Sequence, residues 1–269
     1  MKASEVRDSL LETGVTPSKR MGQHFLLWED LAHRMVEYAD IQPGDTVLEV
    51  GPGLGILTEK LRRRTDRVVA VEKDPRLCAF ITRKFPDLLL LEGDVLRVSL
   101  PPFDKVVSNL PYEISSPFTF MLLGMPFKRA VLTYQREFAK RMVARSGTKA
   151  YSRLSVNVHY RCNSRALEEV PRSAFWPVPE VDSTVVQLDP RSPPFHVDRE
   201  GFHQVVDALF THRRKKAVNA LIYSWSQFAR SKERLKSVLA GTALASKRAQ
   251  ELSPEHIAEL TNLIFPPKG

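Results

Sequence analysis

Short apolar runs alternate with longer helical stretches between Thr46 and Leu188, and this alternation constrains the fold more than any other feature of the sequence. The early apolar runs are nearly uninterrupted, which is typical of parallel strands covered by helices on both faces of a sheet. The pattern therefore predicts a doubly wound α/β domain. The predicted strands are TVLEVG (46–51), RVVAVE (67–72), LLLLEGD (88–94), KVVSNL (105–110), AVLTYQ (130–135), LSVNVHYR (154–161) and STVVQL (183–188).

The predicted helices of this domain are GILTEKLRRRT (55–65), PRLCAFITRKF (75–85), SSPFTFMLL (115–123) and REFAKRMVAR (136–145). No clear helix separates the last two predicted strands. Because parallel strands need a crossover connection, we expect the sheet to end in an antiparallel strand.

A second, all-helical domain is predicted after the proline-rich segment DPRSPPF (189–195). Beyond it the strand pattern stops, and 199–211, 213–229, 231–240 and 254–264 have helical periodicity. Ser253 and Pro254 are typical of an N-cap and a first helical residue. We therefore expect an N-terminal extension (1–17), which we take to be flexible, an α/β domain (18–189) and a small helical domain (190–269).

Several classes of protein are excluded by composition. The longest purely aliphatic run, Leu88 to Leu91, is far too short for a membrane span, and the first residues lack the apolar stretch of a secretory signal. Cys78 and Cys162 are the only cysteines, which excludes a disulfide framework and a cysteine-rich metal site. We expect a cytoplasmic protein, monomeric, with no metal and no membrane partner.

Positive charge is concentrated near the C-terminus. The chain has a net charge of +9, and residues 191–269 contain 13 Lys and Arg against 7 Asp and Glu. Such a concentration favours a polyanionic partner, because each phosphate contact releases condensed counterions. A basic surface without a dedicated partner is an equally good interpretation of charge alone.

A glycine-rich turn, EVGPGLG (49–55), follows the first predicted strand and precedes a helix. Glycines allow backbone amides to approach a ligand closely, and a helix N-terminus favours negative charge. The glycines lie at Gly51, Gly53 and Gly55, so the spacing is G-x-G-x-G and differs from the dinucleotide fingerprint G-x-G-x-x-G. A turn with a purely structural role remains open at this point.

Two acidic residues extend this pattern to a nucleoside pocket. Glu72 ends the second predicted strand, where its carboxylate could accept hydrogen bonds from ribose hydroxyls. Asp94 ends the third, where it could accept from an adenine amino group. Residues at successive strand ends lie at one edge of a parallel sheet. Both NAD and S-adenosylmethionine fit such a pocket.

The tetrapeptide Asn109-Leu110-Pro111-Tyr112 follows the fourth predicted strand and favours methyl transfer to an amino group. An adenine amino nitrogen is a poor nucleophile, because its lone pair is delocalised into the ring. The Asn109 side-chain oxygen and the Leu110 carbonyl could accept both amino hydrogens and direct the lone pair at a methyl donor. Pro111 would stiffen the turn, and Tyr112 could stack on the base. No strong base is needed, so catalysis would consist of positioning and electrostatics.

These motifs together resemble the ribosomal RNA adenine dimethyltransferases, which modify two adjacent adenosines near the 3′ end of small-subunit rRNA. The resemblance runs from about Ser18 to the C-terminus, and NLPYEISSPF is more similar to archaeal or eukaryotic members than to bacterial ones. The motifs that carry it are KRMGQHFL (19–26), EVGPGLGILT (49–58), VEKD (71–74), EGDVL (92–96), NLPYEISSPF (109–118), FWPVPEVDS (175–183) and THRRKKAVNAL (211–221).

The resemblance implies a Rossmann-like class I methyltransferase domain that uses S-adenosyl-L-methionine without a metal. It implies that Phe175 faces the target adenine opposite Tyr112, as for an extruded base. The implied methyl-donor contacts are His24, Leu26, Gly51, Gly53, Gly55, Glu72, Asp94 and Asn109. The run from His212 to Lys216 is expected to begin a helix, on which Arg213, Arg214, Lys215 and Lys216 contact rRNA phosphates.

The function expected from this resemblance is N6,N6-dimethylation of two adjacent adenosines in a hairpin loop of 16S-type rRNA, within a pre-assembled small ribosomal subunit. Three alternatives remain. The chain could be a ribosome-assembly or transcription factor that has lost catalysis, although the intact Glu72, Asp94 and Asn109-Leu110-Pro111-Tyr112 disfavour this. It could be an NAD-dependent oxidoreductase, which the glycine spacing disfavours. It could also methylate adenine in DNA or in another RNA.

Overall fold

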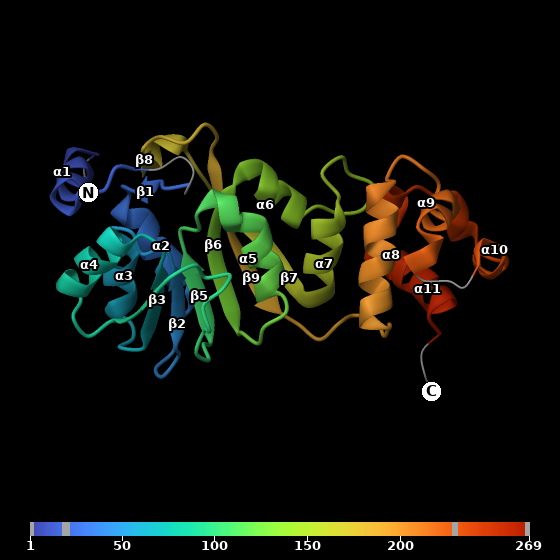
Figure 1. Cartoon of the computed structure of the whole chain (residues 1–269), viewed down its shortest axis with the longest axis horizontal. Coiled ribbons are helices and arrows are strands. Elements are labelled where there is room, and N and C mark those ends of the chain that lie inside the picture. The colour runs from blue at the N-terminus through green and yellow to red at the C-terminus, as the bar shows by residue number, and fades with distance from the viewer. Residues whose placement is uncertain (1–2, 18–21, 228–230, 267–269) are drawn as a thin grey trace. The chain divides into compact units, whose positions relative to one another are not determined.

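A mostly parallel sheet lies at the centre of the α/β part of the chain (Figure 1). The computed structural model describes residues 3–17, 22–227 and 231–266. Within them, seven strands form the sheet in the order β4-β3-β2-β5-β6-β9-β7. Their bounds are β2 (Val47–Val50), β3 (Val68–Glu72), β4 (Leu89–Glu92), β5 (Lys105–Ser108), β6 (Arg129–Gln135), β7 (Cys162–Val170) and β9 (Ser183–Pro190).

The pairing of the strands confirms the predicted fold class. The pairs β2–β3, β3–β4, β2–β5 and β5–β6 are parallel, whereas β6 and β9 are antiparallel. All residues of β2, β3 and β5 are buried, including the polar residues Glu49, Glu72, Lys105 and Ser108, as expected for parallel strands that helices cover on both faces. The strand order reverses at β2 and β5, so this edge of the sheet has the crevice in which doubly wound folds bind ligands.

Helices connect and cover the strands of this sheet. The aliphatic side chains of α2 and α3 form a core with Val47, Val107 and Val131, which belong to three neighbouring strands. The connections β2–α3–β3 and β5–α5–β6 progress in opposite directions from the sheet centre. Because such crossovers are right-handed, α3 and α5 lie on opposite faces. The helices are α2 (Glu29–Ala39), α3 (Ile56–Arg62), α4 (Pro75–Lys84), α5 (Ser115–Leu122) and α6 (Arg136–Met142).

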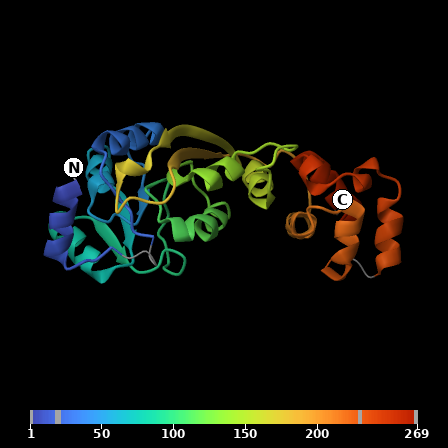
Figure 2. The same ribbon diagram turned by 90° about the horizontal axis from the view of Figure 1, so that it is seen from above.

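Residues 3–13 form helix α1 (Ala3–Thr13), so the expectation of a flexible N-terminal extension is wrong for this segment. Figures 1 and 2 show α1 beside α4. Its Val6 and Leu10 are buried and, together with Val15, pack against Phe25 and Leu54. Burial of these apolar side chains holds the helix against the domain.

The predicted strand 154–161 is wrong, because these residues form helix α7 (Arg153–Arg161). The alternation of Leu, Val and polar residues imitates a strand, but Ser152 and Ser155 form a capping box that starts a helix. The strand of this region is β7, which begins at Cys162. It was missed because it lies at the sheet edge and carries the polar sequence CNSRALEEV.

The chain divides into two compact units, which differ from the predicted domains in one segment. The first contains Met1–Ala139 and Ser164–Pro190, and the second contains Lys140–Asn163 and Arg191–Gly269. Residues 140–163, which the strand prediction placed in the α/β domain, therefore belong to the helical unit. The remaining helices of that unit are α8 (Arg199–Thr211), α9 (Ala217–Tyr223), α10 (Lys232–Leu239) and α11 (Pro254–Ile264).

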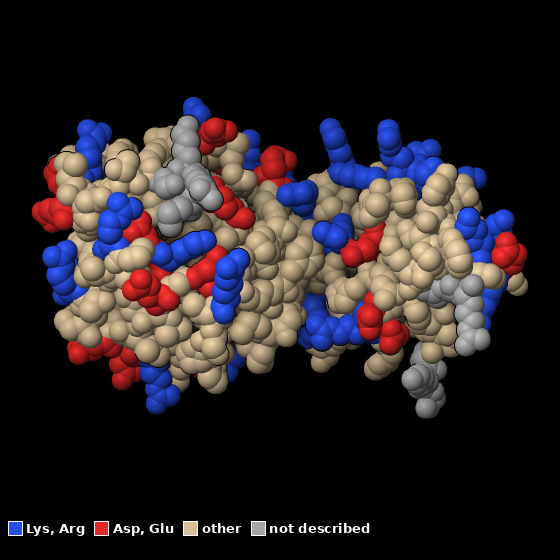
Figure 3. Space-filling view, viewed as in Figure 1, with Lys and Arg blue, Asp and Glu red and all other residues tan. Residues whose placement is uncertain are grey.

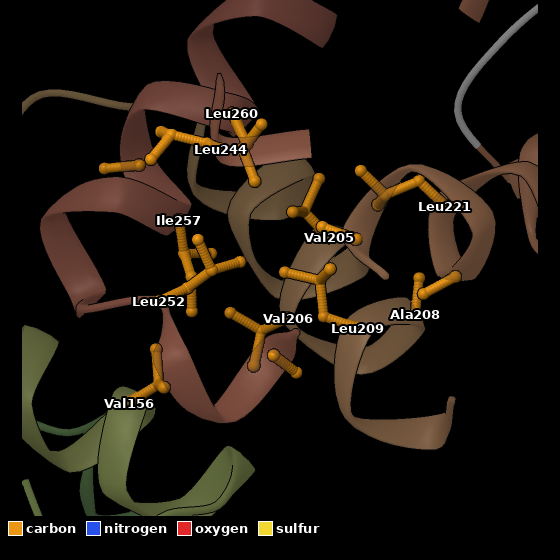
Figure 4. Close-up of a cluster of buried hydrophobic side chains, with 14 of the residues drawn as sticks. Val156, Val205, Val206, Ala208, Leu209, Leu221, Leu244, Leu252, Ile257 and Leu260 are labelled. Carbon is orange, nitrogen blue, oxygen red and sulfur yellow. The ribbon is translucent and has the colours of Figure 1, made fainter. Parts of the chain in front are cut away.

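The helical unit has its own apolar core (Figure 4). Val156 of α7 is fully buried in this core with Val206 of α8 and Ile257 of α11, which explains why α7 is part of the unit. The predicted start of the last helix is confirmed, since Ser253 caps α11 and Pro254 is its first residue. Among the described helices, none has both the length and the apolar character that crossing a bilayer requires.

Candidate active site

A pocket opens at the carboxyl ends of β2, β3, β4 and β5 and contains most of the residues that the sequence singled out. Its wall includes the glycine turn, the ends of β3 and β4 and the segment after β5. The predicted site residues that line it are His24, Leu26, Gly51, Gly53, Glu72, Asp94, Asn109, Leu110, Pro111 and Tyr112. Residues from five separate stretches of the chain therefore meet at the crevice that the strand order creates.

The three glycines of the turn have positive φ angles, of 70° at Gly51, 56° at Gly53 and 78° at Gly55. Other residues rarely adopt this conformation, which explains the glycines. Only Gly51 and Gly53 line the pocket. A side chain at Gly55 would lie 2.6 Å from the ring of Phe85, so this third glycine permits close packing of α3 and does not itself line the pocket.

Glu72 is 6% exposed at the end of β3 and accepts three backbone hydrogen bonds. Its Oε1 accepts from the amides of Lys73 and Asp74 at 2.8 and 3.0 Å, and its Oε2 accepts from Gly53 at 3.3 Å. A carboxylate has about four lone-pair sites, so about one remains free, on Oε2. Burial raises the pKa of Glu72 in spite of these hydrogen bonds.

Asp94 follows β4 and forms an ion pair with Lys73, whose Nζ lies 2.9 Å from Oδ2. The amide of Leu96 donates to Oδ1 at 3.0 Å. The hydrogen bond from Lys73, followed by that from Leu96, lowers the pKa of Asp94. Each carboxylate oxygen retains one lone-pair site, so an ionised Asp94 can still accept a hydrogen bond from a ligand amino group.

Glu49 is a further pocket residue, to which the sequence assigned no role. It is 1% exposed on β2, and the Thr58 hydroxyl donates to its Oε2 at 2.7 Å. Burial raises the pKa of Glu49 to about 8, so the side chain is largely neutral at pH 7 in the absence of a cation. A carboxyl group within the apolar strand VLEV was the signal that could have revealed it.

The Asn109 side chain is held in one orientation by the backbone of the segment before β1 (Phe25–Leu26). Its Nδ2 donates to the His24 carbonyl at 3.0 Å. Since a carbonyl oxygen only accepts, the other amide atom, Oδ1, is directed away from it. Neither Asn109 Oδ1 nor the Leu110 carbonyl accepts a hydrogen bond from any described residue, and both residues line the pocket.

Tyr112 is fixed on two sides. Its ring lies 5.3 Å from the His24 ring at an interplanar angle of 34°, and its hydroxyl is 2.5 Å from the hydroxyl of the fully buried Ser183. The His24 Nδ1 in turn donates to the Pro177 carbonyl at 2.7 Å. Burial raises the pKa of Tyr112, so its hydroxyl is protonated near neutral pH. The Tyr112 ring is thus presented in a defined orientation at the pocket wall.

Phe175 does not face the pocket, and its predicted position opposite Tyr112 is wrong for this structure. Its side chain is 0% exposed and belongs to the core formed by α2, α3 and the sheet. Its strand, β8 (Phe175–Trp176), pairs antiparallel with β1, which places Phe175 opposite Leu26. Phe175 therefore packs in the core beside Leu26, which lines the pocket, and it offers no ring face to a base.

The predicted basic run lies in a turn before helix α9 rather than in the helix itself. The amide of Lys215 donates to the His212 carbonyl, and α9 starts at Ala217 with Lys216 as its N-cap. Arg248 pairs with Lys216 through the backbone, next to Lys247, and the Arg213 guanidinium contacts the Lys149 carbonyl. We call the following residues the basic patch: Lys149, Arg213, Arg214, Lys215, Lys216, Lys247 and Arg248.

Within the described residues, no ion pair joins a member of the basic patch to a carboxylate, although most of its members are exposed. Figure 3 shows Lys and Arg side chains gathered over the helical unit. No group of three or more His, Cys, Asp or Glu residues suitable for a metal ion is found in the described ranges.

Comparisons with known proteins identify the family. The profile of the family "Ribosomal RNA adenine dimethylase" matches residues 16–261. A probable ribosomal RNA small subunit methyltransferase A of Thermococcus kodakarensis is 43% identical over 253 residues, which cover 92% of this chain and 90% of that protein. A protein of Methanosarcina mazei with the same description is 45% identical over 249 residues, which cover 90% of this chain and 91% of that protein.

Two solved structures agree with this result. A dimethyladenosine transferase from Plasmodium falciparum has a TM-score of 0.78 and 30% identity, with 88% of this chain and 96% of that chain covered. The 23S rRNA methyltransferase ErmE has a TM-score of 0.67 and 27% identity, with 90% and 99% covered. The fold, the pocket motifs and the profile thus agree over most of the sequence. The chain therefore belongs to the ribosomal RNA adenine dimethylase family and is a methyltransferase.

Proposed function

We propose that this protein uses S-adenosyl-L-methionine to dimethylate the N6 amino groups of two adjacent adenosines in a hairpin loop near the 3′ end of small-subunit rRNA, within a pre-assembled small subunit. Two observations support the substrate class. The relatives from Thermococcus and Methanosarcina are described as probable small-subunit methyltransferases, and the Plasmodium structure is that of a dimethyladenosine transferase. The side-chain cations of the basic patch form no ion pair with a carboxylate in the part of the chain that the structure describes, and they can contact RNA phosphates.

The residues at the ends of β2, β3 and β4 fit the methyl donor. The free lone-pair site on Glu72 can accept a ribose hydroxyl, and Asp94 can accept from the adenine amino group. The glycine turn lets the backbone approach the rest of the molecule at Gly51 and Gly53. When bound, the donor supplies a methyl group on a positively charged sulfonium. A cation of this kind favours the ionised form of a neighbouring carboxyl group, so a bound donor would lower the pKa of Glu49, which burial raises in the empty pocket.

The observation that carries the proposal is the orientation of the Asn109 amide. Its Nδ2 is occupied by the His24 carbonyl, which leaves Oδ1 and the Leu110 carbonyl as two neighbouring acceptors at the pocket wall. We assign them the two hydrogens of the target amino group, an arrangement that favours a pyramidal nitrogen with its lone pair available. Tyr112, held by His24 and Ser183, provides the stacking surface for the base. Catalysis then rests on preorganised acceptors and not on a strong base.

Methyl incorporation tests this assignment. Small ribosomal subunits are incubated with the enzyme and isotopically labelled S-adenosyl-L-methionine. Mass spectrometry of their rRNA then maps the adenosines that gain mass. We expect two adjacent adenosines to gain two methyl groups each, and Asn109→Ala to lower the rate by about 100-fold or more. Thermal unfolding of the variant controls for folding. Equal, negligible incorporation by wild type and variant would instead support a non-catalytic assembly factor.

The same experiment separates small-subunit rRNA from another RNA target. The similarity to ErmE, which is a 23S rRNA methyltransferase, is a reason to include large-subunit rRNA as a second substrate. We expect the small-subunit RNA to be methylated in preference. Preferential labelling of 23S-type RNA would overturn the target and leave the chemistry of the site intact.

A further inference from the structure

Tyr223 is an aromatic side chain whose position the fold does not explain. It lies at the end of α9 and is 65% exposed. The residues that attach this helix to the unit are Ala217, Ala220 and Leu221, which are buried in the apolar core. Tyr223 contributes no comparable burial, so its aromatic ring is not required for packing.

The ring of Tyr223 is flanked by His212 and Lys215, which belong to the turn before α9. The Lys215 Nζ lies 4.4 Å from the ring centroid, within the range of a cation–π interaction. The His212 ring lies 5.3 Å away at an interplanar angle of 41°. Because Lys215 covers one side of the ring and the residue is still 65% exposed, much of the ring surface remains open to solvent.

We propose that Tyr223 is a stacking platform for an unpaired nucleobase, on a strand of RNA whose phosphates contact the basic patch. This proposal rests on the proposed function, because it takes RNA as the substrate. Every base has an aromatic face, so stacking on Tyr223 requires no particular sequence. Lys215 stabilises the ring in place from one side, and Arg213, Arg214 and Lys216 supply cations for the neighbouring phosphates.

The charge of the surroundings favours a nucleic acid over an apolar protein partner. The side-chain cations of the basic patch form no ion pair with a carboxylate among the described residues, and they come from three separate stretches of the helical unit. An exposed aromatic ring next to unpaired cations is the combination that proteins use to bind single strands. A duplex, whose bases are stacked on each other, would contact the cations alone.

Fluorescence binding experiments with the full chain test this platform. One probe is an unstructured RNA oligonucleotide with a single 2-aminopurine, and the other is a blunt RNA duplex of equal charge. Stacking on Tyr223 should quench the 2-aminopurine. We expect Tyr223→Ala to remove the quenching and weaken single-strand binding about tenfold, with duplex binding unchanged. Tyr223→Phe, which keeps the ring, should behave like wild type.

The salt dependence distinguishes stacking from a loss of charge contacts. Because tyrosine is neutral, Tyr223→Ala should shift the affinity by the same factor at every salt concentration and leave the slope unchanged. Equal losses for single strand and duplex, or no loss for either, would overturn the platform. Methyl incorporation by the wild type is measured in parallel. If the wild type incorporates methyl groups but Tyr223→Ala leaves RNA binding unchanged, only the platform is rejected. If Tyr223→Ala weakens single-strand binding but the wild type incorporates no methyl groups, only the proposed activity is rejected.

Discussion

At the scale of single residues, the His24 side chain connects the donor side of the pocket to the proposed base side. Its Nδ1 faces the Pro177 carbonyl, which can only accept, so Nδ1 carries the hydrogen. Its ring lies against Tyr112, and its own carbonyl accepts from Asn109. His24 is therefore a positioning residue that orients both proposed substrate contacts.

Two substitutions separate the ring from the hydrogen bond. His24→Asn retains an N–H donor near the position of Nδ1, whereas His24→Phe retains a ring without a donor. Because a short hydrogen bond joins two loops here, we expect His24→Phe to lower kcat/KM by about tenfold and His24→Asn by only a few fold. Steady-state kinetics with RNA as the varied substrate measure this. A larger loss of kcat/KM in His24→Asn than in His24→Phe would show that His24 acts through the contact of its ring with Tyr112.

The buried side chain of Glu49 should make the stability of the folded protein depend on pH. Its pKa of about 8 in the folded protein lies above the ordinary value of 4.5 for a glutamate, so the folded protein holds a proton that the unfolded chain releases. This contribution to stability is present below pH 4.5 and is lost as pH rises through 8. We expect Glu49→Gln, which stays neutral and can still accept from Thr58, to gain stability relative to wild type as pH increases from 5 to 8.

Thermal unfolding of both ligand-free proteins at several pH values checks the Glu49 prediction. The expected difference is on the order of a few kcal/mol at the alkaline end. A constant difference in melting temperature across this pH range would mean that Glu49 is ionised in the folded protein.

Most pocket residues could be predicted from the sequence because they follow strands at one sheet edge. Glu72, Asp94 and Asn109 lie where their strand ends place them. Phe175 and Gly55 lie outside the pocket lining. A motif indicates which loop a residue belongs to, but it does not show whether that residue faces the ligand or packs in the core, as Phe175 does. The contacts of His24 with Pro177 and Tyr112 join residues far apart in sequence, and no local pattern contains them.

At the scale of elements, helix α1 is coupled to the pocket through shared side chains. Leu10 is 2% exposed and packs in one cluster with Phe25 and Leu54, both of which line the pocket. The next residue, Leu11, is 73% exposed. These neighbours differ in burial alone and form a matched pair of test positions.

Substitution of the two leucines tests the coupling of α1 to donor binding. We expect Leu10→Ala to destabilise the protein by about 2 to 5 kcal/mol and to weaken donor binding, because the cavity loosens the support of Phe25 and Leu54. Leu11→Ala should change neither quantity appreciably. Denaturant unfolding and calorimetric titration with the methyl donor provide the measurements. Loss of stability with unchanged donor affinity would show that α1 is not coupled to the pocket.

The elements that the sequence did not predict correctly share a physical cause. Buried parallel strands such as β2 and β3 are marked by uninterrupted apolar residues, and these were predicted. Strand β7 lies at the sheet edge, and most of its side chains are exposed or half-buried. Its sequence therefore lacks the alternation of apolar and polar residues that marks a strand, and it resembles a loop. Helix α7 is determined by its capping box and by packing in the helical unit, and these override the β-like alternation of its sequence.

At the scale of the whole molecule, charge and chemistry are distributed between the two units. The pocket lies in the first unit, and the basic patch lies in the second. Residues 191–269 account for a net charge of +6 out of +9. We therefore infer that RNA affinity and donor affinity can be changed independently by substitutions in different units.

Neutralisation of four cations in each unit tests this division. Replacing Arg213, Arg214, Lys215 and Lys216 by Gln should weaken RNA binding and reduce the slope of log affinity against log salt by about 3, because four phosphate contacts are lost. The control replaces four exposed cations of the first unit, Arg63, Arg64, Arg67 and Arg83. The first three lie before β3, at the edge of the sheet opposite to the pocket, so the control changes net charge equally without touching either site. Donor affinity should be unchanged in both variants. An equal reduction of the salt slope in both would show that RNA binding responds to total charge, and would remove the reason to assign phosphate contacts to the basic patch.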